Sequence, residues 1–136
     1  MAERLSSQQW VDAWLRKAEH DIETADRALR AGTPITDTAA YHCHQAAEKA
    51  LKAYLAWRGE PVAKIHDLMA LLTRCNSVEP RFAEWADKLA DLSAFGTVLR
   101  YPSLDADPSL NDATDALKVA RQINGFVISL TRASSV

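Results

Sequence analysis

The chain has 136 residues, and 16 Lys and Arg against 18 Asp and Glu give it a formal net charge of −2. Proteins that bind nucleic acid regardless of its sequence carry a large positive excess, which neutralises phosphates. The charge balance therefore excludes a broadly basic nucleic-acid binder and leaves room for one small basic patch. Hydrophobic residues make up 48% of the chain, which excludes a disordered polymer.

The length suits a single domain, which we place at residues 1–136. With 4 Gly and 5 Pro the chain has too few turn residues for a many-stranded sandwich or barrel, so long helices are expected. No apolar run approaches the ~20 residues that span a bilayer, and the first residues lack the pattern of a signal peptide. We therefore expect a cytoplasmic protein without a membrane partner, in which Cys43 and Cys75 are reduced thiols.

Apolar residues recur at steps of three and four along most of the chain, which is the spacing of one helix face. The first predicted helix has Ser6 or Ser7 as its N-cap and ends at Gly32 and Pro34. The second has Thr36 or Asp37 as its N-cap and runs to Gly59, with an apolar side of Ala40, Cys43, Ala47, Leu51, Tyr54 and Leu55. The short turn between these two long helices predicts that they pack antiparallel.

Three shorter or later helices complete the prediction. They run from Asp67 to about Cys75, from near Pro80 to about Gly96, and onward from Asp107 and Pro108, which suit an N-cap and a first helical position. Residues 97–107 form the longest irregular stretch, and no strand pattern is present. The predicted fold is an all-α, up-and-down bundle of about five helices.

Several motifs with a defined chemistry are absent from the sequence. No two glycines lie close together, which excludes Walker A and dinucleotide-binding loops. No histidine has a glutamate three positions before it, as di-iron bundles require. His42 and His44 would lie about 200° apart around a helix, so they cannot share a metal ion. We interpret His44 as a partly buried structural side chain, and we predict no metal site and no cofactor.

A polar helix face is the first candidate binding feature. His42, Gln45, Lys49 and Lys52 recur at steps of three and four on the second predicted helix, and His66 follows in the connection after it. These residues could line a site for an anion. A solvated helix surface shows the same pattern, so both interpretations stay open.

The second candidate is Arg100-Tyr101-Pro102, within the irregular stretch. An arginine can place two parallel hydrogen bonds on a phosphate, and a tyrosine ring can stack on a base. The alternative is structural: Arg100 would cap backbone carbonyls of the loop, and Tyr101 would fill space beneath it.

The run Tyr41–Leu55, YHCHQAAEKALKAYL, resembles the signature helix of HEPN domains, the higher-eukaryote and prokaryote nucleotide-binding domains. His66-Asp67-Leu68 and Arg100-Tyr101-Pro102 resemble the other two landmarks of that family, in the same order, and the similarity spans about residues 8–132. The resemblance implies an up-and-down helical bundle that usually pairs as a homodimer and has a link to nucleotides or RNA. It also implies a small nucleotidyltransferase as partner, often in a toxin–antitoxin pair.

Active HEPN proteins are similar to metal-independent ribonucleases that use an arginine followed, after four to six residues, by a histidine. Such a histidine can move a proton while the arginine stabilises the charge on phosphorus. After Arg100 this chain reads YPSLDADPSL, without a histidine. The sequence therefore leaves enzymatic activity open.

Three functions follow from these observations. The first is a homodimeric module for a nucleotide or RNA phosphate, in which Arg100 grips phosphate and Tyr101 stacks on a base. In this function Lys49, Lys52 and His66 line the cleft, with Gln45 and His42 on the same helix face. The alternatives are a protein-interaction partner of a nucleotidyltransferase that binds no ligand, and a ribonuclease with a degenerate motif.

Overall fold

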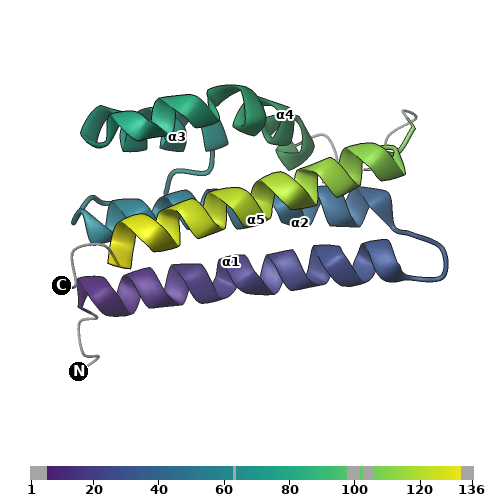
Figure 1. The fold of residues 1–136 in the computed structure, drawn as a ribbon, viewed down its shortest axis with the longest axis horizontal. Helices are drawn as coiled ribbons and strands as arrows, with labels where there is room; N and C mark the ends of the chain where they lie inside the picture. The colour runs from purple at the N-terminus through teal and green to yellow at the C-terminus, as the bar shows by residue number, and fades with distance from the viewer. Residues whose placement is uncertain (1–5, 63, 98–101, 103–105, 133–136) are drawn as a thin grey trace.

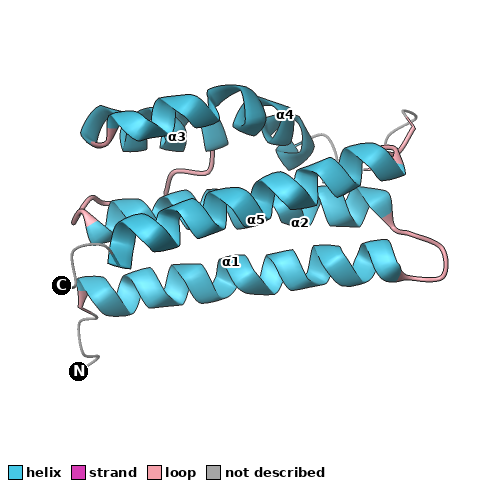
Figure 2. Ribbon diagram, in the orientation of Figure 1, coloured by secondary structure: helices cyan, strands magenta, loops and turns pink. Residues whose placement is uncertain are grey.

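The computed structural model of the chain describes residues 6–62, 64–97, 102 and 106–132. Within these ranges the chain forms helices and no strand, in the order α1 (Ser7–Arg30), α2 (Thr36–Trp57), α3 (Leu68–Val78), the 3-10 helix η1 (Pro80–Trp85), α4 (Ala86–Thr97) and α5 (Leu110–Arg132). Figure 2 shows this all-helical architecture, which confirms the predicted bundle of about five helices.

The two long N-terminal helices form an antiparallel hairpin (Figure 1). Ser6 begins α1 as predicted: its hydroxyl accepts a hydrogen bond from the Gln9 N–H, and the Gln9 side chain accepts one from the Ser6 N–H. This reciprocal pair satisfies two N–H groups that the first turn of a helix leaves without partners. The predicted N-cap of α2, Thr36 or Asp37, was wrong, because Ile35 is the N-cap and makes no side-chain hydrogen bond.

Helix α2 is the centre of the molecule, and it contacts α1, α3, α4 and α5. Helix α1 packs on α2 and α5, whereas α3 and α4 form a layer over the opposite side of those two helices (Figure 1). Every residue of the predicted apolar side of α2 is buried, at 2% exposure or less. Alanines on the other sides of α2 are buried as well, and their small side chains let the surrounding helices approach closely.

The second half of the chain differs from the prediction mainly at helix ends. The carboxylate of Asp67 caps α3 by accepting hydrogen bonds from the Met69 and Ala70 N–H groups, at 2.9 and 3.1 Å. Pro80 begins a 3-10 turn, not an α-helix, and α4 follows from Ala86. The predicted cap of α5 was wrong: α5 begins at Leu110, and the Ser109 hydroxyl, not Asp107, accepts from the Asp112 N–H at 3.0 Å.

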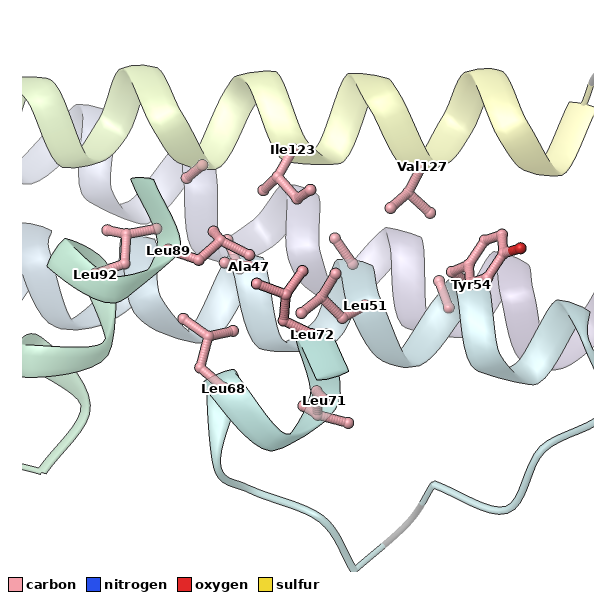
Figure 3. Packing of buried hydrophobic residues seen from close by; sticks show 14 of the residues in the cluster. Ala47, Leu51, Tyr54, Leu68, Leu71, Leu72, Leu89, Leu92, Ile123 and Val127 are labelled. Carbon is pink, nitrogen blue, oxygen red and sulfur yellow. The ribbon is translucent and has the colours of Figure 1, made fainter. Parts of the chain in front are cut away.

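The core fills the space between α2 and the helices around it. Figure 3 shows Leu51 of α2 beside Leu72 of α3, with Ile123 of α5 above them. Tyr54 lies further along α2, where the centre of its ring is 4.8 Å from the centre of the Phe82 ring in η1. Within the described part of the chain, no helix combines the length and the apolar composition needed to cross a membrane.

Candidate functional site

A polar cleft of about 630 Å³ opens beside α2. Helix α2 supplies one wall, made of His44, Gln45, Glu48, Lys49 and Lys52. Trp14 of α1 forms a second wall. The start of α3 and the segment before it contribute His66, Asp67 and Leu68, and α4 contributes Ser93 and Gly96. The cleft therefore joins residues from four helices that are far apart in the sequence.

A buried charge pair forms the floor of the cleft. The Lys52 ammonium lies 3.2 Å from a carboxylate oxygen of Glu48, and the two side chains are only 2% and 8% exposed. Nδ1 of His66 lies 3.4 Å from the same ammonium and 3.7 Å from the same carboxylate oxygen. The indole of Trp14 covers the ammonium from α1, with its ring centre 5.2 Å away. Lys52 is thus fixed by a carboxylate, an imidazole and an aromatic face.

The second ammonium group of the cleft, that of Lys49, is held by Asp21 of α1. Asp21 is 7% exposed, and its carboxylate accepts hydrogen bonds from Lys49 at 2.5 Å and from Nδ1 of His42 at 2.8 Å. Burial disfavours the ionised carboxylate, but these two hydrogen bonds outweigh burial, so the pKa of Asp21 lies below its usual value. Asp21 therefore stays ionised and orients Lys49 at the edge of the cleft.

His44 is buried against α4, where it meets a glycine. It is 6% exposed, and its Nδ1 lies 3.2 Å from the side-chain oxygen of Gln45. A Cβ atom at Gly96 would lie 2.4 Å from Nε2 of His44. Only the absence of a side chain at Gly96 lets the imidazole occupy this position, so the contact defines one end of the cleft.

The Gly96→Ala substitution tests this contact. We expect it to lower the free energy of unfolding by about 1 kcal/mol, because the cost of displacing the imidazole exceeds the gain in helix propensity. In a His44→Ala background the same substitution should instead raise the free energy of unfolding by roughly 0.5 kcal/mol. Urea denaturation of the four proteins measures both effects.

Gly125 provides the matched control for that experiment. It lies within α5, and a Cβ atom there would meet nothing within 4 Å. Gly125→Ala should therefore stabilise the protein by about 0.5–1 kcal/mol in either background. If Gly96→Ala has the same sign with and without His44, the close contact does not limit the site.

The two thiols do not take part in this site. Burial raises the pKa of Cys43 to about 12 and that of Cys75 to about 12, so neither is a thiolate at neutral pH. Among the residues with described positions, no group of three or more His, Cys, Asp or Glu side chains could hold a metal ion.

The predicted site residues fall into three groups. The structure places Gln45, Lys49, Lys52 and His66 together on the lining of the cleft. His42 does not line the cleft, because its imidazole turns to Asp21 of α1. Arg100 and Tyr101 lie outside the described residues.

Sequence reasoning missed several residues that complete the cleft. Glu48 could have been predicted from its spacing, because it precedes Lys52 by four residues and so faces it across one helical turn. His44 was correctly interpreted as buried, but its place at the cleft was not predicted. Trp14, Asp21 and Gly96 carried no local signal, because tertiary packing alone brings them to α2.

Comparisons with known proteins agree with this architecture. The model of the HEPN domain family matches residues 11–130. Among solved structures, the chain is similar to ST0689, an archaeal HEPN homologue, with a TM-score of 0.65 and 27% sequence identity over 89% of this chain and 97% of that one. No curated protein matches the sequence. The chain belongs to the HEPN domain family.

Proposed function

We propose that the cleft binds the phosphate group of a nucleotide or of RNA, and that the chain acts as a HEPN-type binding module. One observation carries the proposal: Lys49 and Lys52 of α2 line a single cleft together with His66, which comes from the segment before α3. Its volume of about 630 Å³ lies within the range of about 300–1,000 Å³ that is common for small-molecule sites.

The charge pairs of the cleft support anion binding through preorganisation. An ammonium group has three N–H donors, and Lys49 directs one of them to Asp21. The carboxylates hold the two ammonium groups in place, so a phosphate would meet donors that are already oriented. His66 is 73% exposed at the rim, where its imidazole can turn to a ligand and donate from both nitrogens when protonated.

The cleft also lies close, along the chain, to the predicted residues Arg100 and Tyr101. Gly96 lines the cleft and precedes Arg100 by four residues, a length of chain that spans at most about 14 Å. We propose that Arg100 adds a guanidinium to the phosphate site and that Tyr101 stacks on the ligand.

Isothermal titration of the full chain with ATP, inorganic pyrophosphate and a short single-stranded RNA tests the proposal. We expect His66→Ala and Arg100→Ala each to weaken binding by about tenfold or more, because each removes a charge-assisted hydrogen bond to phosphate. Lys118→Ala removes an exposed cation on α5 that does not line the cleft, and it should leave binding unchanged.

Two results would contradict the proposal. One is equal binding by wild type and by both variants, which would leave Arg100 and His66 as structural residues. The other is no binding of any of the three ligands by the wild-type chain. That second result would favour the alternative in which the chain acts only as a protein-interaction partner.

The partners implied by the family are also proposals. We propose that the chain forms a homodimer and works with a small nucleotidyltransferase in a toxin–antitoxin-like system. Light scattering and co-purification with the product of an adjacent nucleotidyltransferase gene test these two statements. A monomer at micromolar concentration would exclude the first, and failure of the two proteins to co-purify would count against the second.

A further inference from the structure

An apolar notch of about 300 Å³ adjoins the polar cleft. Trp10 and Trp14 of α1 form one side, and Pro61 and Val62 form the other. Gly59 has a φ of +77°, and the Glu60 N–H donates to the Leu55 carbonyl at 2.9 Å. This turn folds the chain after α2 back beside the first turns of α1, so the walls of the notch are held by backbone structure.

The two tryptophans of the notch differ in their exposure to solvent. Trp10 is 46% exposed, the largest side chain among the exposed hydrophobics of the described residues. Trp14 lies four residues later on the same face of α1 and is partly buried against the core. The core of this chain therefore does not account for Trp10, which is nearly half exposed and lines the notch.

Trp14 connects the notch with the cleft, because it lines both. On the cleft side, the Lys52 ammonium lies 5.2 Å from the centre of its ring. A ligand that placed a planar ring in the notch would thus have its remaining part next to Lys52 and His66. The matching chemistry is a planar aromatic group joined to an anion.

We propose that the notch of Trp10, Trp14, Pro61 and Val62 is a stacking subsite for the base of a nucleotide whose phosphates occupy the polar cleft. The inference rests on the proposed function and identifies the ligand as a whole nucleotide, recognised by its base as well as by phosphate. Every base has a π-face that an indole can cover, so stacking gives affinity with little dependence on sequence.

Titrations with ATP and with inorganic pyrophosphate separate the two parts of the site. Trp10→Ala should bind ATP about tenfold more weakly than wild type, which corresponds to the loss of one base–aromatic contact. Its affinity for pyrophosphate, which has no base, should not change. Trp10→Phe should recover most of the affinity for ATP, because it restores an aromatic face.

Leu110→Ala is the matched control, since Leu110 is 50% exposed and lies outside the notch. It should leave the binding of both ligands unchanged. If the wild-type chain binds pyrophosphate and Trp10→Ala binds ATP as tightly as wild type, the stacking subsite is wrong and the proposed function stands. If the wild-type chain binds neither ligand, the proposed function itself is wrong.

Discussion

Phe82→Ala is expected to lower the free energy of unfolding by about 3–5 kcal/mol. Phe82 is fully buried. The centre of its ring lies 4.8 Å from that of Tyr54 of α2 and 5.1 Å from that of Phe126 of α5, both in edge-to-face geometry. The substitution removes the transfer energy of the ring, leaves a cavity and breaks two aromatic contacts. For a domain of this size the loss lowers Tm by roughly 10–20 °C.

The result would show that η1 joins the two layers of the bundle. Urea denaturation measures the loss, and Leu110→Ala is the control, because truncation of a half-exposed leucine should change stability by less than about 0.5 kcal/mol. A loss of no more than about 1 kcal/mol for Phe82→Ala would mean that the surrounding rings collapse into the space. The η1 segment would then have no such role.

The helices were predictable because their apolar spacing is set by the helix itself. Leu51 and Tyr54 belong to one α2 face whatever packs against it, and that face is buried as predicted. Local capping was also readable at Ser6, where the hydroxyl and the third helical residue form a reciprocal pair. At Ile35 and Ser109 the path of the connecting chain decides where the helix begins, and local propensity does not contain that path.

The cleft was predictable only in part, for the same reason. Periodicity placed Gln45, Lys49 and Lys52 on one side of a helix, but it could not say whether that side meets solvent or protein. In the structure Lys52 is 2% exposed, so the polar face is not a solvated surface. Its environment is made by Trp14 and Asp21, which lie on α1 and are distant from α2 along the chain.

Removing one member of the buried Lys52–Glu48 pair should have the second large effect. Lys52→Met retains most of the side-chain volume but leaves the Glu48 carboxylate, 8% exposed, without its ammonium partner. We expect the free energy of unfolding to fall by about 3–5 kcal/mol, because an uncompensated charge would remain in the interior. The double variant Lys52→Met/Glu48→Gln should recover most of this loss, since it removes both charges.

The exposed pair Arg27–Glu23 separates burial from pairing as the cause. It has the same spacing of four residues on a helix, but its side chains are 77% and 58% exposed. Arg27→Met should therefore cost less than about 0.5 kcal/mol, as solvent screens the remaining carboxylate. Urea denaturation of the two double-mutant cycles gives the coupling energies, which should be large for Lys52–Glu48 and close to zero for Arg27–Glu23. Equal coupling in both cycles would mean that the cleft does not isolate its charges from water, and Lys52 would then offer a phosphate no more than a surface lysine does.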